Sequence, residues 1–209
     1  VPTTQLERGW MNTSALSVLN LSNKQWLTSI LLDDVDRGAA NPWGVACSAD
    51  GKWLVVAHSG THDISVIDRP ALHARIQKAV DGKTVSKVAE TLQNIPNDLA
   101  FIQGLRRRVS LPGKGPRGLI LKDGKAIVAE YFSDSLALVD LADDRKPRIR
   151  RISLGEPGGL NARRRGEIAF HDAEICFQNW QSCASCHPDA RADALNWDLL
   201  NDGIGNSKD

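Results

Sequence analysis

The sequence has little of several features that would place it in a particular class. No stretch approaches the roughly 20 apolar residues that cross a bilayer, so we expect no membrane span. The formal net charge is +1 and no basic stripe alternates with aromatic residues, which gives no reason to expect a nucleic-acid partner. Four cysteines include a single C-x-x-C pair, so a disulfide framework does not fit.

Methionine and tyrosine are also scarce, with one of each. No signal peptide precedes Val1, so we expect either a processed mature chain or a fragment. The six tryptophans fit a cofactor or carbohydrate surface or, more simply, buried structural side chains. With 42% apolar residues in 209, the chain resembles an ordinary globular protein and has room for one or two domains.

Two segments repeat the same order of motifs. Residues 41–46, Asn-Pro-Trp-Gly-Val-Ala, correspond to residues 115–120, Gly-Pro-Arg-Gly-Leu-Ile. Each is followed by Asp-Gly-Lys, at residues 50–52 and 123–125, and then by two apolar runs separated by a polar turn. Short β-branched runs between Asp-Gly turns predict antiparallel strands joined as hairpins.

A four-stranded sheet of this kind cannot bury both of its faces alone, so the copies must stack, as the blades of a propeller do. Residues 16–31 supply an outer half-blade, which gives a partial all-β propeller of about two and a half blades over residues 1–155. Because propellers close with about 4–8 blades, we expect missing blades or another chain to cover the sheet edges.

The first copy is longer because of residues 70–106, which we interpret as an insertion on one rim of the propeller or as a solvated excursion. Leu72, Ile76 and Val80 recur at helical spacing and predict a helix, and a second short helix is expected to start near Pro96.

Residues 156–159, Glu-Pro-Gly-Gly, form a linker to a second domain over residues 156–209. Arg163, Arg164 and Arg165 then either contact a haem propionate or an acidic partner, or begin a solvated helix.

The strongest chemical signal is the run Cys183-Ala184-Ser185-Cys186-His187. Two intervening residues set the cysteines at the spacing of the haem vinyl groups, and the adjacent histidine is placed to bind the iron. Haem c attachment by Cys183, Cys186 and His187 is therefore the leading interpretation. A redox dithiol, half of a zinc site and coincidence are the alternatives; the first lacks a βαβ context and the second lacks two further ligands.

Residues 165–172 and 180–187 resemble the first haem-binding segment of the bacterial di-haem cytochrome c peroxidase and methylamine-utilisation-type enzymes. The match covers residues 163–209, and the blades resemble YVTN-type propellers. The resemblance implies an all-β propeller followed by a mainly α-helical cytochrome c segment, with His187 as the proximal ligand.

The same resemblance bears on residues after the motif. A tryptophan relays electrons between the two haems of the family, and Trp197 follows the motif here. Gly203, Gly205 and Asn206 fall where the family has a Gly-rich turn before a calcium-binding asparagine, which implies calcium as a second ligand. However, no second C-x-x-C-H occurs and neither histidine nor methionine follows His187, so one haem at most is expected.

Five further side chains are candidates. His58 and His62 flank a three-residue turn and would present both rings to a metal or simply form hydrogen bonds in the loop. His171 would approach the haem or pack in a helix. Cys47 is expected to be a buried small side chain in a strand, and Cys176 a free thiol near the haem.

The function that these observations predict is haem-dependent electron transfer or peroxidase-type oxidoreduction in the periplasm or outside the cell. The propeller would serve as a docking platform for a redox partner protein. The alternative is a propeller that acts as a binding module, with the haem segment incomplete or unfilled.

Overall fold

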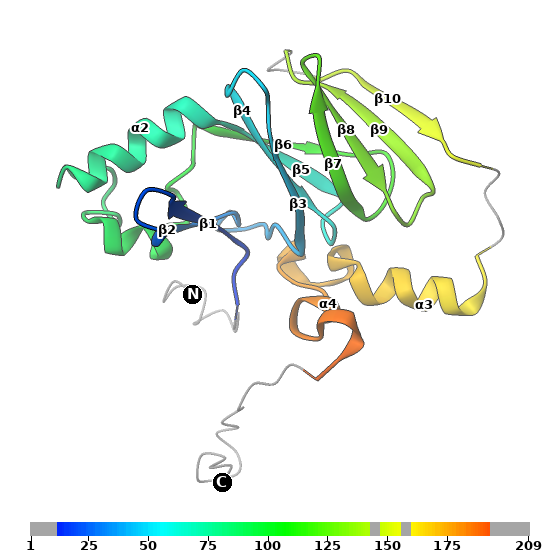
Figure 1. Cartoon of the computed structure of the whole chain (residues 1–209). Helices are drawn as coiled ribbons and strands as arrows, with labels where there is room; N and C mark the ends of the chain where they lie inside the picture. Colours follow the sequence, from blue (N-terminus) through cyan, green and yellow to red (C-terminus); the bar gives the residue numbers. More distant parts are fainter. Residues whose placement is uncertain (1–11, 143–146, 156–159, 193–209) are drawn as a thin grey trace, which may run out of the picture.

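The computed structural model describes residues 12–142, 147–155 and 160–192. Within these residues the strands form three antiparallel sheets (Figure 1). The first sheet pairs β1 (Ala15–Asn20) with β2 (Gln25–Leu31), and two four-stranded sheets follow in chain order. The β-rich part of the predicted fold is therefore confirmed.

Each four-stranded sheet is a simple meander, in which every strand pairs with the next along the chain. The strands of the first are β3 (Pro42–Cys47), β4 (Trp53–His58), β5 (Asp63–Asp68) and β6 (Arg106–Ser110). Those of the second are β7 (Pro116–Lys122), β8 (Lys125–Glu130), β9 (Ser135–Asp140) and β10 (Ile149–Ser153). These are the two blade-like units that the repeated motifs predict.

The repeated Asp-Gly-Lys motif lies in the turn between the first two strands of each sheet. Its glycines have positive φ angles, 72° at Gly51 and 70° at Gly124, which a glycine adopts at little cost. In the second sheet Asp123 is also left-handed, with φ of 49°, so a two-residue turn joins β7 to β8. This backbone requirement explains why the motif occurs in both copies.

The turn between the second and third strands is equivalent in the two sheets as well. Its last residue is left-handed in both, with φ of 53° at His62 and 46° at Asp134. Each of these residues accepts a backbone hydrogen bond from the end of the fourth strand, from Leu111 N–H at 3.0 Å and from Leu154 N–H at 2.9 Å. The backbone thus places His62 at a repeated structural position, although the side chain there differs between copies.

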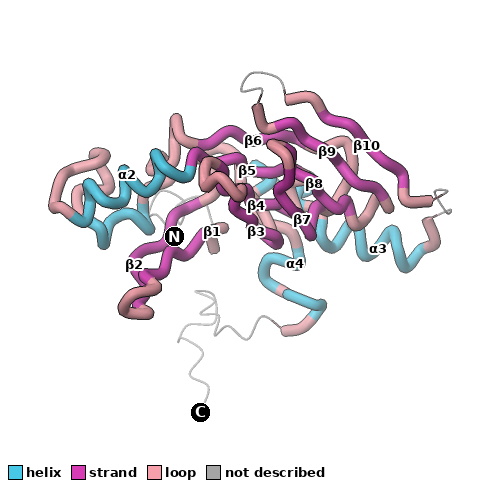
Figure 2. Tube along the Cα trace, turned by 45° about the horizontal axis from the view of Figure 1, so that its top comes forward, coloured by secondary structure: helices cyan, strands magenta, loops and turns pink. Residues whose placement is uncertain are grey.

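The two sheets pack face to face, with β3 beside β7 (Figures 1 and 2). Small and β-branched side chains fill the space between them because alternate residues of each strand point to the same face. The buried members are Val55, Ala57, Ile64, Val66, Val109, Ala126, Val128, Ala137, Val139 and Leu141.

Between β5 and β6 the chain forms α2 (Arg69–Val80) and the 3-10 helix η1 (Leu92–Asn97). Asp68 caps α2 by accepting a hydrogen bond from Ala71 N–H at 2.9 Å. The second helix lies earlier than predicted, because Pro96 falls inside it rather than at its start.

The insertion provides the core on which the first sheet lies, and α2 and β1–β2 are neighbours in both views (Figures 1 and 2). Leu72 and Ile76 are buried in this core as predicted, but Val80 is 47% exposed and Ala79 is buried in its place. Residues spaced exactly four positions apart shift gradually around the helix and away from its buried face, because the helix has 3.6 residues per turn.

The described residues after β10 form α3 (Ala162–His171) and then short turns. These turns are η2 (Ala173–Ile175), η3 (Phe177–Asn179), the single-turn helix α4 (Cys183–Cys186) and η4 (Pro188–Ala190). A mainly helical cytochrome segment is thus not shown here. No described helix is both long and apolar enough to cross a membrane.

Candidate functional site

The C-x-x-C-H run folds as the single helical turn α4 with His187 immediately after it. Cys183 and Cys186 stand at the first and last positions of the turn, three residues apart, and therefore on the same face of the helix. Cys183 is exposed, Cys186 is partly buried, and neither thiol forms a disulfide.

Hydrogen bonds at the N-terminal end of α4 hold it against the first blade. The hydroxyl groups of Ser182 and Ser185 both donate to Asn41 Oδ1, at 2.8 and 3.0 Å. The Ser182 N–H donates to Ser185 Oγ at 3.0 Å, which satisfies one of the free donors at the helix start. Asn41 is left-handed with φ of 56° and directly precedes β3, so the blade fixes its position.

A histidine nitrogen that donates a hydrogen bond leaves the other nitrogen free to accept or to bind a metal. His187 Nδ1 lies 3.0 Å from the carbonyl oxygen of Arg191, which can only accept, so Nδ1 carries the proton. The residue is exposed, and the lone pair of its ring is on Nε2.

The two cysteines and His187 open onto one cavity of about 480 Å³. Its wall also includes the third thiol of this region, Cys176, which is half-buried. Ile175 contributes a large apolar surface and is 73% exposed. The remaining lining residues are Asp172, Gln181 and Ser182.

The segment that carries the cavity, residues 160–192 (the docked segment), also packs on residues outside the two four-stranded sheets, through backbone and side-chain contacts. Trp180 is 2% exposed, packs with Leu31 and Leu99, and donates from Nε1 to the carbonyl oxygen of Asn12 at 2.9 Å. The Gly38 N–H donates to the Gln178 carbonyl at 2.8 Å. Through these contacts, residues at the start of the chain support a turn about 140 positions later.

The two histidines of the β4–β5 turn have different surroundings. His58 is fully buried and its Nε2 lies 2.8 Å from Ser65 Oγ. Burial, with the charges of Arg108 and Arg106 nearby, holds the pKa of His58 well below its usual range, so the ring is neutral. His62 instead faces Asp172 on the docked segment. The structure therefore does not bring the two rings to one metal.

Two other predicted side chains, His171 and Cys47, lie outside the cavity. His171 ends α3, where its Nδ1 donates to the Glu167 carbonyl at 2.9 Å and its ring packs on Phe132, and it does not line the cavity. Cys47 lies in β3 as predicted, but its burial was predicted wrongly, because its side of the strand is exposed.

The arginine run begins α3. Arg164 pairs with Glu167 at 2.9 Å, and Arg165 donates to the carbonyl oxygen of Leu160. These contacts match the interpretation of the run as a helix start. Other residues raised by the sequence lie outside the described residues: Trp197, Gly203, Gly205 and Asn206.

Sequence reasoning missed the residues that join the docked segment to the blades. In the sequence Asn41 stands out only as part of a repeat, and Lys114 and Glu174 belong to no motif. Lys114 Nζ lies 2.6 Å from Asp172 Oδ2 and 3.3 Å from Glu174 Oε2. No local pattern marks such pairs, because 58 residues separate Lys114 from Asp172 along the chain.

The chain matches no known protein-family model. It is 25% identical over 146 residues to hydrazine synthase subunit beta of Kuenenia stuttgartiensis, a match that covers 69% of this chain and 36% of that protein. The chain thus spans little more than a third of the length of this curated relative. Among solved structures, the hydrazine synthase of Kuenenia stuttgartiensis is similar with a TM-score of 0.46 and 22% identity, over 68% of this chain and 36% of that one.

The predicted membership of a family that fuses a YVTN-type propeller to a di-haem cytochrome c peroxidase domain is wrong. The relative is a hydrazine synthase beta subunit, and no family model supports the fusion. The reason is chemical: the spacing of C-x-x-C-H follows from the haem vinyl groups, so unrelated proteins share it. The motif therefore does not by itself show a family relationship.

Proposed function

We propose that this chain carries a covalently attached haem on Cys183 and Cys186, with His187 as an axial ligand, and transfers electrons as one subunit of a larger assembly. Bound haem c supplies one-electron chemistry, with a potential that the axial ligand and its surroundings adjust. The protein residues have three tasks in this proposal: attachment, orientation of the axial ring, and shielding of one side of the site.

The observation that carries the proposal is the convergence of all three motif residues on one cavity. Both thiols are free, share one face of α4, and stand at the wall of about 480 Å³ of open space. The residues present therefore fit the group: two nucleophilic sulfurs for thioether bonds, and apolar surface from Ile175 beside them.

The hydrogen bond of His187 supports its role as the axial ligand. Ligating histidines commonly donate their second ring N–H to a backbone carbonyl, which fixes the tautomer and the ring orientation. His187 Nδ1 makes this bond to Arg191 at 3.0 Å, so Nε2 is the atom available to the iron. Zinc binding by the same motif has less support, because these three side chains do not belong to the metal-ligand cluster that the described residues form.

The relative supports the second half of the proposal. Its name makes it one subunit of a hydrazine synthase, and a chain similar to a subunit is expected to work with partner chains. We infer that the exposed side of the cavity faces a redox partner protein. Because haem c attachment needs an oxidising compartment and a maturation system, we place the protein in the periplasm or outside the cell.

The test is to export the full chain in a host that contains haem c maturation factors, and to measure its mass and its visible spectrum. We expect the mass of one haem and a Soret band that survives acid–acetone extraction. Cys183→Ala and Cys186→Ala should each leave at most one thioether and lose most of the retained colour. Cys176→Ala is the matched control, because it removes a thiol from the same cavity and should leave the haem in place.

An unmodified mass after export with the maturation factors would contradict the proposal and favour a haem-free binding module. Equal loss of haem in the Cys176→Ala variant would contradict the assignment of the attachment residues.

A further inference from the structure

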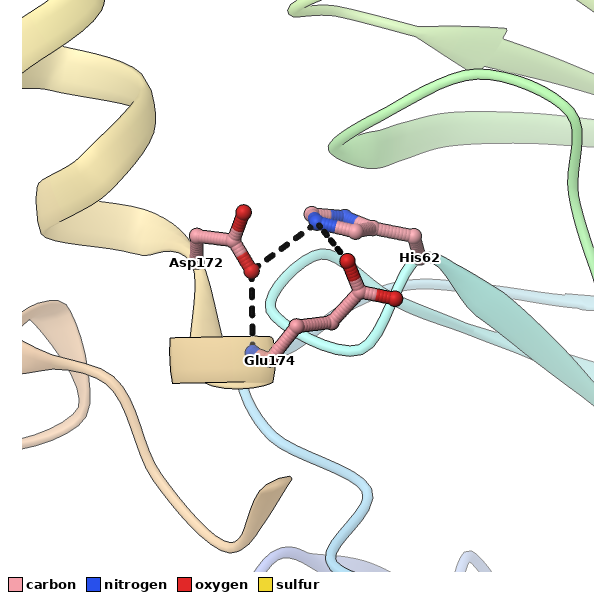
Figure 3. Close-up of side chains that lie close together, drawn as sticks. All are labelled: His62, Asp172 and Glu174. Atoms are coloured by element: carbon pink, nitrogen blue, oxygen red, sulfur yellow. Dashed lines mark hydrogen bonds and ion pairs between the residues drawn. The ribbon is translucent and has the colours of Figure 1, made fainter. Parts of the chain in front are cut away.

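A second group of potential ligands lies where the docked segment meets the first blade (Figure 3). His62 comes from the turn between β4 and β5, and Asp172 and Glu174 come from the end of α3 and from η2. His62 Nε2 lies 3.2 Å from Asp172 Oδ1 and 3.9 Å from Glu174 Oε2. One ligand atom of each residue lies within 4.8 Å of the other two.

The His62 ring is the buried member of this group and points into it. Its side chain is 6% exposed, and its Nε2 atom makes no hydrogen bond although it is inaccessible to solvent. Buried polar atoms without a hydrogen-bond partner are rare in folded proteins, and a bound ion is one way in which such an atom is satisfied. Nε2 faces the two carboxylates, which are the groups that attract a cation (Figure 3).

The other nitrogen of His62 has two backbone neighbours that select opposite tautomers. Nδ1 lies 3.1 Å from the Ser59 carbonyl oxygen, to which it can donate, and 3.1 Å from Gly115 N–H, from which it can accept. When Nδ1 donates to Ser59, the lone pair is on Nε2 and faces the carboxylates. A carbonyl behind a ligating histidine is the usual outer contact of a protein metal site.

The spacing of the donors fits a small divalent ion. Bonds of about 2.0–2.2 Å to nitrogen and oxygen at tetrahedral angles place neighbouring donor atoms about 3.4 Å apart. The two distances from His62 Nε2, 3.2 and 3.9 Å, lie on either side of this value. An imidazole with two carboxylates is a donor set that suits zinc and its neighbours better than calcium, which prefers oxygen alone.

A cation already lies beside the same carboxylates. The Lys114 ammonium is 2.6 Å from Asp172 Oδ2 and 3.3 Å from Glu174 Oε2. Burial raises the pKa of Asp172, but the hydrogen bonds from Lys114 and from Glu174 N–H outweigh it, so the pKa lies below the usual value and the group is ionised. The Lys114 side chain is 44% exposed and can therefore turn out to solvent when another cation arrives.

We propose that His62, Asp172 and Glu174 bind a divalent metal ion of the zinc class, in competition with the ammonium group of Lys114. The ion ties the blade turn to the docked segment. These two elements already share a backbone hydrogen bond, from Ala173 N–H to the Gly60 carbonyl at 2.9 Å. Because the unfolded chain does not assemble the three ligands, metal binding stabilises the docked arrangement.

The site is distinct from the C-x-x-C-H motif, so the experiment removes that motif first. The full chain with Cys183→Ala and Cys186→Ala contains neither a haem attachment site nor the two thiolates that would also bind zinc. Zinc chloride is then titrated into this background by calorimetry, and cobalt(II) is used as a spectroscopic probe. We expect one saturable site per chain and a cobalt spectrum without a thiolate-to-metal band.

Three variants in this background test the ligands. His62→Asn keeps a residue that tolerates positive φ, and Glu174→Gln changes an exposed carboxylate; each should weaken zinc affinity at least tenfold. Lys114→Gln should tighten binding several-fold because it removes the competing ammonium, a result that a purely structural ion pair would not produce. His73→Asn, an exposed histidine on α2, is the control and should leave the affinity unchanged.

Absence of a saturable site in the background chain would overturn the proposal. So would zinc affinity that Lys114→Gln fails to increase, or a cobalt spectrum with a thiolate band. A negative result here leaves the haem proposal untouched, because the background chain lacks both attachment cysteines and cannot hold haem covalently.

Discussion

At the scale of single residues, the structure buries several ionisable groups and satisfies them in different ways. Asp63 is buried and pairs with Arg108 at 2.6 Å. Glu130 occupies the equivalent of the His58 position in the second sheet, where it accepts hydrogen bonds from Gly113 N–H at 2.7 Å and Ser135 Oγ at 2.5 Å. Asp33 accepts only backbone N–H groups, from Ala39 at 2.6 Å and Ser14 at 2.7 Å, in the described part of the chain.

Asp33 makes the stability of the protein depend on pH in a defined direction. Burial raises its pKa from 3.8 to about 6, against the hydrogen bonds from Ala39 and Ser14. Between these values the folded protein binds more protons than the unfolded chain, so its contribution to stability falls as pH rises from about 4 to about 6. A shift of about two units corresponds to about 3 kcal/mol.

Urea unfolding of the wild type and of Asp33→Asn at several pH values between 4 and 7 isolates this effect. Other carboxylates titrate in both proteins and cancel in the difference. The free energy of unfolding of the wild type should fall relative to the variant as pH rises. Parallel curves would mean that Asp33 does not titrate in this range.

The surroundings of individual side chains are the part of the site that the sequence predicts least well. The C-x-x-C-H motif predicts Cys183, Cys186 and His187 as site residues, because the haem vinyl groups would set this spacing, and the structure brings all three to one cavity. By contrast, the exposure of Cys47 depends on what covers β3, which no local pattern encodes. His62 could be recognised as a metal-binding residue type, but its partners Asp172 and Glu174 come from a distant segment.

At the scale of elements, the strands were predictable and the irregular helices were not. The two meanders follow from short-range chemistry, because the left-handed turns at Gly51 and Gly124 demand the glycines that mark the repeat. The 3-10 helix η1 contains Pro96, a residue that sequence reasoning uses as a helix start. Its position is set by packing of Ile95 in the core of the insertion, which is a tertiary effect.

The helix α3 offers a test of local helix stability. Gly166 lies in its interior, and a Cβ atom there would meet nothing within 4 Å. Gly166→Ala should therefore raise the free energy of unfolding by about 0.5–1 kcal/mol, because glycine loses more backbone entropy in a helix than alanine does. Circular dichroism during thermal unfolding measures the change.

Gly82→Ala is the matched comparison for Gly166→Ala. It also enters open space, but its φ of 71° is unfavourable for alanine, so it should destabilise by about 1 kcal/mol. If both variants stabilise the protein, backbone conformation is not what decides their effect.

At the scale of the whole molecule, the docked segment depends on one close approach. A Cβ atom on Gly38 would overlap Trp180 Cα and the carbonyl oxygen of Asn179. Gly38→Ala should therefore force the docked segment away from the loop between β2 and β3, at a cost of about 1–3 kcal/mol. Limited proteolysis should then cut within residues 160–180 more rapidly than in the wild type.

Gly118→Ala is the control for Gly38→Ala, since a Cβ atom at Gly118 meets Ala129 Cβ at 3.9 Å, an ordinary contact. Equal protease resistance of Gly38→Ala and the wild type would show that the segment does not need this approach. This docking was beyond sequence reasoning, because it joins Gly38 to Trp180 without any shared motif.

The helical insertion also affects how the chain avoids mispairing strands between its two similar sheets during folding. Two sheets with the same turns and the same register can exchange strands during folding, and such misassembly is a known hazard of repeated units. Here the connection from β5 to β6 runs through α2 and η1, whose core includes Ile30 of β2 and the adjacent Leu32, whereas only residues 141–148 lie between β9 and β10 in the sequence. If a strand of the second sheet replaced β6 in the first sheet, the core formed by α2, η1 and the first strand pair would lose its covering helix. The insertion therefore distinguishes the first sheet from the second, and it energetically favours the correct pairing of strands within each sheet.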